Sequence, residues 1–509
     1  MKHLRSLYTL LFGVAVLLFF GLAYPHHLHY QEQYQLFLFD STYVWEIVKL
    51  PGGVADLLGR FCTQFFLYAW VGALIIALLL SAVQLLTFML LSLAQIQTSQ
   101  ISSLSRGGAE AILYGLSFVP SFLLWVFLLD ENALLGGVWA VLLTLLAAWV
   151  IIKVAHGWLR YILLIAAIPI LYFLAGPVCF PIPIDSLWSG IHYHRYPTVF
   201  PWLLWAAALS VFVLVFVACI FRRFHFSFKS GSKSFVFLSF CLFIFAIGGY
   251  IVWKNANFKA EKVMQYDFMA RHQQWNRILE TVNKEKPNNQ IGVTVQNLAL
   301  AMNGMLLEQM FNYHQNGIAG LLPDVKEDAT SPLPTAEAFY HLGMINVAQR
   351  TVFEAQEAIL DFQKSARCYK RLAETNLING NYAVARKYLK ALQKTFFYRK
   401  WANETLPLLG DEEAIAQHPE YGRLRQFAYK KDLILGQNSS RSTISSELDG
   451  SRLTGDFYFS DHVTPEMLES LYLGNTDNRL AYQYLLAYCL LTGDRERFNL
   501  YYSQRGTDR

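Results

Sequence analysis

The acidic side chains best placed to do chemistry lie between residues 25 and 60, in the segment that separates the first two apolar runs. They are Glu32, Asp40, Glu46 and Asp56. A carboxylate beside a membrane could act as a general base on a substrate hydroxyl group. This chemistry alone does not choose among the four. The alternative is that each is a helix-capping or interfacial acid, a common role for such residues.

The same segment contains three histidines, His26, His27 and His29, and a later loop contains His192 and His194. Imidazoles from two loops could bind zinc or copper. No cysteine or acid stands at ligand spacing beside them, and the six cysteines contain no C-x-x-C pair. We therefore predict no metal site and no cofactor, and we expect Cys368 and Cys489 to be packed thiols.

The composition indicates the kind of scaffold that positions these residues. Only 16% of the 509 residues are charged and 54% are hydrophobic, whereas a soluble protein has roughly 25% charged residues. Residues 1–255 contain 13 Lys/Arg and 8 Asp/Glu, while residues 256–509 contain 29 of each. This balance predicts an apolar membrane module, 1–255, followed by a soluble domain, 256–509. The neutral second half argues against nucleic-acid binding.

Seven apolar runs approach the length of about 20 residues that a bilayer span requires. They are Leu7–Tyr24, Phe65–Leu93, Ala111–Leu129, Leu134–Ile152, Tyr161–Leu174, Trp202–Phe221 and Phe235–Trp253. None contains an acidic residue, which argues against an ion-coupled transporter. We read the first run as an uncleaved anchor, with a cleaved signal peptide as the alternative.

The basic residues between the runs predict the orientation, because Lys and Arg concentrate in cytoplasmic loops. A cytoplasmic N-terminus leaves Lys49, Arg60 and Arg195 outside and nine basic residues inside: Lys2, Arg5, Arg106, Lys153, Arg160, Arg222, Arg223, Lys229 and Lys233. Seven crossings then place residues 256–509 on the outer, periplasmic face of a bacterial cytoplasmic membrane.

The segment 25–60 is too apolar for a solvated linker, and we expect one or two helices in the membrane interface, with Phe39, Tyr43 and Trp45 at headgroup depth. Seven spans with such a loop resemble the membrane glycosyltransferases that use lipid-linked sugar donors. The resemblance implies a lipid-linked substrate and a catalytic carboxylate, which maps to Asp40 or Glu32. The chain lacks the paired acidic motif of the better-defined members.

The second half shows helical periodicity with regular glycine turns, which predicts stacked helical hairpins. In the segment 370–396, Leu372 and Ala373 pack the first helix, Gly380 makes the turn, and Ala385 opens the second helix. In the segment 337–362 we place Leu342 in the first helix and the turn at Arg350. A third hairpin turns at Gly493. These segments resemble the tetratricopeptide repeat, which implies a face for partner proteins.

Asparagine and glutamine side chains on the predicted first helices are the candidate partner-binding residues: Asn346, Gln349, Asn376 and Asn379. Each could instead serve as a helix-end or turn residue. A stretch rich in Ser, Gly and Asp near 437–460 is expected to be a mobile loop.

Taken together, the seven spans, the motif QLFLFDSTYVWEIVKLPGGVADLLGRFCTQFF and the run RLAETNLINGNYAVARKYLKALQKTFFYRKWA resemble an uncharacterised family of bacterial multi-pass membrane proteins. The predicted fold class is all-α. The predicted function is a membrane protein whose outer domain binds partner proteins, as a scaffold in cell-envelope assembly. The alternative is a lipid-linked sugar transferase.

Overall fold

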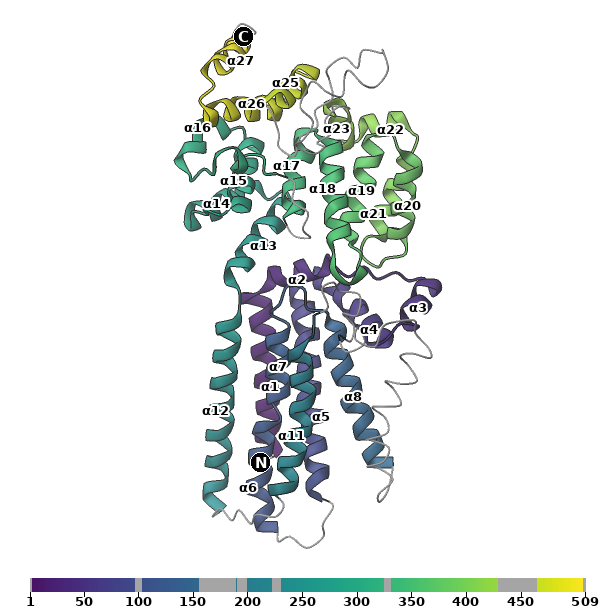
Figure 1. The fold of residues 1–509 in the computed structure, drawn as a ribbon, viewed down its shortest axis with the longest axis vertical. Helices are drawn as coiled ribbons and strands as arrows, with labels where there is room; N and C mark the ends of the chain where they lie inside the picture. Colours follow the sequence, from purple (N-terminus) through teal and green to yellow (C-terminus); the bar gives the residue numbers. More distant parts are fainter. Residues whose placement is uncertain are drawn as a thin grey trace. The chain divides into compact units, whose positions relative to one another are not determined.

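The computed structural model describes residues 2–96, 103–154, 189, 199–221, 230–324, 331–428 and 465–506. Every regular element within these ranges is a helix (Figure 1), which confirms the predicted all-α fold class. The chain divides into two compact units, Met1–Glu261 and Lys262–Arg509, called here the N-terminal and C-terminal units. The boundary expected from the sequence lies at residue 255. The predicted mobile loop near 437–460 is outside the described residues.

The N-terminal unit contains apolar helices and the helices of the segment 25–60. Its elements are α1 (Lys2–Leu18), the π-helical turn η1 (Phe19–Ala23), α2 (Pro25–Glu32), α3 (Ser41–Val48), α4 (Gly53–Thr63), η2 (Gln64–Leu67), α5 (Ala69–Ile96), α6 (Ser103–Leu116), α7 (Val119–Phe127), α8 (Leu135–Val154), α11 (Trp202–Phe221) and α12 (Ser230–Asn255). The segment predicted to hold one or two helices before residue 61 therefore forms three.

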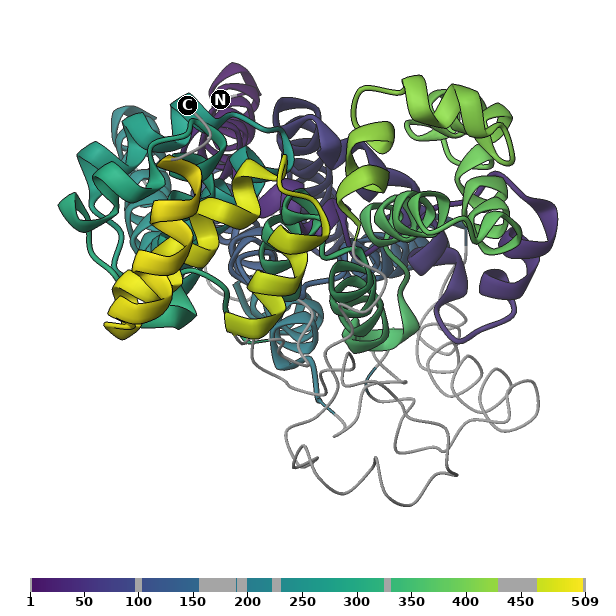
Figure 2. The ribbon, with the colours of Figure 1, turned by 90° about the horizontal axis from the view of Figure 1, so that it is seen from above.

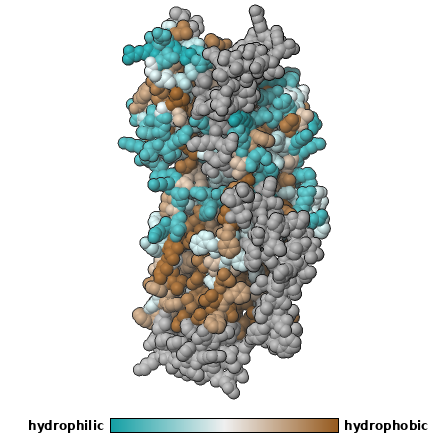
Figure 3. Space-filling view, in the orientation of Figure 1, coloured by the Kyte–Doolittle hydropathy of each residue, from teal (hydrophilic) through white to brown (hydrophobic). Residues whose placement is uncertain are grey.

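Five helical segments in the described part of the chain are long and apolar enough to cross a membrane: His3–Ala23, Ala69–Leu93, Glu110–Phe127, Leu135–Val154 and Phe237–Asn255. Each coincides with a predicted span. A sixth predicted span, Trp202–Phe221, has the same bounds as α11, but the apolar helical stretch found there, Trp202–Ala218, is shorter than the other five. The remaining one, 161–174, lies outside the described residues. Hydrophobic side chains cover the face of the long helices shown in Figure 3.

Hydrogen bonds between buried polar side chains connect the helices of this unit. Gln84 on α5 accepts a hydrogen bond from the Thr9 hydroxyl on α1 (2.9 Å) and donates one to the Ser117 hydroxyl (2.8 Å). Thr9 also lies 2.8 Å from the hydroxyl of Tyr114 on α6. Such bonds between helices contribute about 1 kcal/mol each in an apolar environment. These polar side chains therefore hold α1, α5 and α6 together.

Two glycines set the close approach between α4 and α8. A Cβ atom on Gly59 would lie 2.4 Å from the backbone nitrogen of Gly136, and one on Gly136 would lie 3.0 Å from Cα of Asp56. The backbones therefore touch with no side chain between them. On the same helix, α4, Arg60 donates two hydrogen bonds to the carboxylate of Asp56, which lies one turn earlier. They come from Nε (3.0 Å) and Nη2 (2.7 Å).

The C-terminal unit consists of short helices and turns. They are α13 (Phe258–Arg271), which begins in the N-terminal unit, α14 (Trp275–Glu285), α15 (Gln290–Met302), α16 (Leu306–Gln309), η5 (Met310–Asn312), η6 (Gly317–Gly320), α17 (Pro332–Leu342), α18 (Ile345–Ala358), η7 (Leu360–Phe362), α19 (Ala366–Ile378), α20 (Tyr382–Gln393), α21 (Arg399–Thr405), η8 (Leu406–Leu408), α22 (Glu412–Gln417), α23 (Tyr421–Phe427), α25 (Pro465–Gly474), α26 (Arg479–Thr492) and α27 (Arg495–Gly506).

Consecutive helices of this unit pair as hairpins, and the pairs α17/α18 and α19/α20 lie side by side (Figures 1 and 2). Gly343, Gly380 and Gly493 make the turns with φ of 94°, 79° and 74°, a conformation that glycine adopts without steric cost. The predicted turns at Gly380 and Gly493 are therefore confirmed. The predicted turn at Arg350 is wrong, because Arg350 lies inside α18 and the chain already turns at Gly343.

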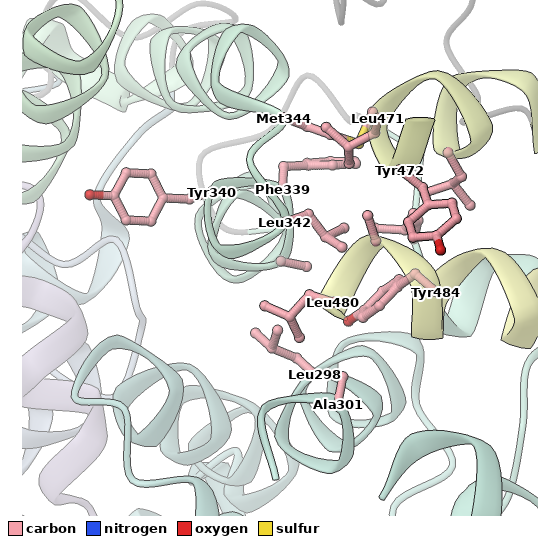
Figure 4. Close-up of a cluster of buried hydrophobic side chains, with 14 of the residues drawn as sticks. Leu298, Ala301, Phe339, Tyr340, Leu342, Met344, Leu471, Tyr472, Leu480 and Tyr484 are labelled. Atoms are coloured by element: carbon pink, nitrogen blue, oxygen red, sulfur yellow. The ribbon is translucent and has the colours of Figure 1, made fainter. Parts of the chain in front are cut away.

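One face of α17 packs into the main apolar core of the unit. Phe339, Leu342 and the adjacent Met344 meet residues of α25 and α26 there, while Tyr340, which belongs to the same core, lies on the opposite side of the helix (Figure 4). The described cysteines Cys368 and Cys489 are buried free thiols, as predicted.

The contact between α4 and α8 predicts the effect of a single methyl group. Gly59→Ala should destabilise the protein by about 1 to 3 kcal/mol, because the added Cβ overlaps the backbone of α8. The apparent melting temperature of the full-length protein in detergent measures this effect. Gly249→Ala on α12 is the matched control, since its Cβ would meet no atom within 4 Å. Equal melting temperatures for both variants would contradict the close contact.

Candidate functional site

Asp40, the first candidate catalytic residue, is the N-cap of α3. Its Oδ1 accepts the backbone N–H groups of Thr42 (2.9 Å) and Tyr43 (3.3 Å). This is the capping role that we weighed against catalysis, and it satisfies donors that a helix start otherwise leaves unpaired. Glu32, the second candidate, is the last residue of α2 and only 4% of its surface is exposed. The two carboxylates thus belong to different elements of the segment 25–60.

One further buried carboxylate of the N-terminal unit, that of Glu261, was not among the predicted site residues. Its Oε1 accepts the backbone N–H of His26 and its Oε2 accepts that of His27, both at 2.8 Å. Burial raises the pKa of Glu261 to about 7, against the two backbone N–H groups, which lower it. A group with such a pKa changes charge near neutral pH. The only sequence signal was an acid soon after the last predicted span.

His27 lies beside this carboxylate and is fully buried. Its Nε2 is 2.9 Å from the carbonyl oxygen of Leu128, and its ring lies 4.7 Å from that of Tyr24. Burial lowers the pKa of His27 to about 4, so the ring is neutral and its Nε2–H donates to Leu128. Among the described residues no group of three or more His, Cys, Asp or Glu side chains could hold a metal ion. His192 and His194 lie outside them.

A network of buried charges occupies the C-terminal unit around Glu337, which lies on α17, a helix buried on every side. Glu337 accepts from Arg367 (3.3 Å) and from Arg371 (2.7 Å), two residues one turn apart on α19. Arg367 also forms a two-bond ion pair with Asp267 of α13, at 2.6 and 2.9 Å. The carboxylate therefore connects three helices that are distant in sequence.

Arg371 makes two further contacts in the same network. It donates to Glu374 on its own helix at 2.9 Å. Its guanidinium also lies 3.6 Å from the centre of the buried Tyr340 ring. A cation over an aromatic ring is stabilising when water is excluded.

Burial and the neighbouring arginines determine the protonation states of Glu337 and His341. Burial alone would raise the pKa of Glu337, but Arg371 and Arg367 lower it to about 2. His341, one turn along α17, has its pKa lowered to about 4 by burial, although Glu337 lies 4.0 Å away. Neither ring nitrogen of His341 has a hydrogen-bond partner in the described part of the chain. The network therefore holds an ionised carboxylate beside a neutral imidazole.

Three of the four predicted partner-binding residues meet at the contact between α18 and α19. The Asn379 amide donates to the side-chain oxygens of Asn346 (2.9 Å) and Gln349 (3.3 Å). Asn346 and Gln349 lie on the second helix of their hairpin, so the prediction that all four belong to first helices was wrong for these two. Asn376 is buried and donates to the carbonyl oxygen of Leu372 on its own helix (2.7 Å).

Sequence analysis also missed Phe353, which lies four residues after Gln349 on α18 and is 51% exposed. Asn346, Gln349 and Phe353 follow the spacing i, i+3, i+7, so they share one face of the helix. We call these three residues the α18 strip. The misplaced turn at Arg350 concealed it, because the strip is continuous only if α18 begins before Asn346.

His341 should make the C-terminal unit less stable in acid. Its pKa is 6.5 in the unfolded chain and about 4 in the folded one, so its contribution is fully present above pH 6.5 and is lost as the pH falls toward 4. At pH 5 the loss is about 2 kcal/mol. His341→Leu should remove this part of the pH dependence. The stability lost between pH 7.5 and pH 5 is measured by thermal unfolding, with proteolysis of the C-terminal unit as the readout. Identical pH profiles for both proteins would contradict the prediction.

Comparison with known proteins identifies a family and gives no chemistry. No curated protein and no solved structure matches the chain. A model described as a family of unknown function, DUF6057, matches residues 2–509 and so covers both units. This match confirms the predicted resemblance to an uncharacterised family. The chain therefore belongs to the DUF6057 family.

Proposed function

We propose that the protein is a multi-pass protein of the bacterial cytoplasmic membrane whose C-terminal unit, on the outer face, binds a partner protein in envelope assembly. The observation that carries this proposal is the α18 strip. It places an exposed aromatic ring beside two amides whose oxygens are already engaged by Asn379. Large aromatic residues supply much of the binding energy in protein interfaces. The partner on this face is a protein. The N-terminal unit anchors the chain itself in the lipid bilayer.

The fixed geometry of the strip favours binding. Asn379 comes from a neighbouring hairpin, so the side chains of Asn346 and Gln349 are oriented before a partner arrives. A surface that is already ordered loses less conformational entropy on association. Beyond the amides, Arg350 pairs with Glu354 at 2.6 Å and gives the strip a charged border. An aromatic centre with a polar border is the usual arrangement of a protein interface.

The α18 strip can be tested by placing a photo-crosslinking amino acid at position 353 of the full-length protein and identifying the protein that it captures. Binding of that purified protein is then measured for two variants. Phe353→Asp should weaken binding at least about tenfold, because a charge replaces the aromatic contact. Phe311→Asp is the control, since Phe311 is similarly exposed but lies in η5. Equal affinities for the two variants would refute the strip as the binding face.

The proposed orientation rests on the basic residues of the loops, nine inside against three outside. A reporter that is active only in the cytoplasm should be silent when fused after Arg509 and active when fused after Lys229. The opposite pair of results would reverse the orientation and place the C-terminal unit inside the cell.

The alternative function, a transferase that uses a lipid-linked sugar, needs a carboxylate in the outer loop as its base. Asp40→Asn removes the base but keeps the helix cap, because Asn and Asp cap helices almost equally well. The variant should therefore complement a deletion strain fully. Loss of a general base typically lowers a rate by two to four orders of magnitude. An abundant, folded Asp40→Asn protein that fails to complement would favour the transferase.

A further inference from the structure

One side of α20 carries four exposed basic residues, which follow the helical spacing i, i+1, i+4 and i+8. We call them the α20 basic face: Arg386, Lys387, Lys390 and Lys394. The other side of the helix packs into the C-terminal unit through the buried residues Ala385, Leu389 and Leu392. A helical rise of about 1.5 Å per residue gives the basic face a length of about 12 Å. The face is therefore a continuous strip of positive charge.

No carboxylate of the same helix balances this charge. The sequence contains no acidic residue between Glu374 and Glu404, although residues 256–509 contain equal numbers of acidic and basic residues. Within the described part of the chain, Arg386, Lys387 and Lys390 form no ion pair. Their charges are therefore open to a ligand from outside the protein.

The stability of α20 accounts for only part of this charge. Cations in the last turn of a helix are stabilised by its dipole, which explains Lys390 and Lys394. Arg386 and Lys387 lie in the first half of α20, where the dipole gives a cation no advantage. Arg386 and Lys390 also lie one turn apart, and like charges at that spacing repel each other. A negatively charged surface outside the chain explains the four residues together.

An exposed aromatic ring follows the basic face, in the turn between α20 and α21. Phe396 is 59% exposed, and its ring contacts that of Phe397, with the ring centres 4.9 Å apart. The Thr395 hydroxyl fixes this turn, because it donates to the carbonyl oxygen of Leu392 (2.7 Å) and accepts the backbone N–H of Tyr398 (3.2 Å). Basic residues with an aromatic residue beside them are typical of surfaces that bind anionic membranes.

We propose that the α20 basic face, with Phe396 beside it, binds the anionic headgroups of a lipid bilayer. The chain itself keeps a bilayer close to this unit, because Phe237–Asn255, long and apolar enough to cross a membrane, ends just before the unit begins at Lys262. A tethered surface needs only a weak attraction to be bound. Each basic residue near an anionic surface strengthens the attraction about fivefold. This inference does not depend on the α18 strip.

A fluorescent aromatic amino acid at position 396 of the full-length protein tests this contact in lipid nanodiscs. Nanodiscs of neutral phosphatidylcholine are compared with nanodiscs in which about one third of the lipid is anionic phosphatidylglycerol. Both contain a lipid with a nitroxide on its headgroup, which quenches a nearby fluorophore. Quenching should be at least about twofold stronger with the anionic lipid, and salt at about 0.5 M should remove the difference by screening charge. Equal quenching in the two lipids would overturn the proposal.

Two charge-reversal variants identify the residues responsible. Lys387→Glu combined with Lys390→Glu should abolish the effect of the anionic lipid, and it breaks no ion pair in the described part of the chain. Arg277→Glu combined with Lys284→Glu is the control, because these residues are exposed on α14 and the net charge changes equally. The control should keep the lipid effect.

Three other outcomes would overturn the proposal. A lipid effect that persists in the Lys387/Lys390 variant would assign it to other residues. Its loss in the α14 control would assign it to net charge. Fluorescence that ignores the lipid but responds to added polyglutamate would assign the α20 basic face to an acidic protein instead.

Discussion

A single carboxylate inside a fully buried helix dictates the construction of the C-terminal unit. Glu337 lies on α17, every residue of which is buried, and an unpaired charge in that position would cost several kcal/mol. Arg367 and Arg371, one turn apart on α19, form ion pairs with Glu337. Arg367 also forms an ion pair with Asp267 of α13. The position of Glu337 thus fixes the register of α19 and of α13 against α17. Apolar packing alone allows more than one such register.

The two sides of α17 meet different partners. Phe339 and Leu342 pack toward α25 and α26, while Tyr340, which is also part of the apolar core, points the other way and has the Arg371 guanidinium over its ring. The proposed binding strip follows from this arrangement. The network holds α19 against α17. The second helix of the α17/α18 hairpin, α18, therefore lies with its strip beside Asn379.

The N-terminal unit is held together by other means, as its composition requires. Its helices approach through glycine backbones, as at Gly59 and Gly136, and through neutral hydrogen bonds around Gln84. Charged pairs lie toward the ends of its helices, as Arg5 and Glu110 do at 2.7 Å. Charge in an apolar unit is thus kept where its desolvation costs least. Glu261 also lies near a helix end, in the first turn of α13, and burial there raises its pKa to about 7.

The sequence was sufficient for local features and insufficient for contacts between distant segments. Apolar runs and the turn glycines Gly380 and Gly493 follow from length and backbone conformation, so they could be predicted. The turn at Gly343 was missed because Leu342 was equated with Leu372, which lies inside its helix before the turn at Gly380, whereas Leu342 is the last residue of α17. The partners Asp267, Glu337 and Arg367 are separated by 30 to 100 residues along the chain. No spacing rule relates them, and Glu261 meets His27 at a still longer separation of 234 residues.

The importance of the buried network is tested most directly by hydrogen exchange of the α17 and α19 amides in full-length Arg367→Met and Arg497→Met. Both arginines bond to carboxylates in the same unit, but Arg497 and its partners are partly exposed. Removing one partner of a buried pair costs about 3 to 5 kcal/mol, so Arg367→Met should accelerate exchange on the order of 100- to 5000-fold. Arg497→Met should change it by less than about tenfold, because exposed pairs contribute at most about 1 kcal/mol. Equal exchange rates in the two variants would contradict the claim that the unit is organised around Glu337.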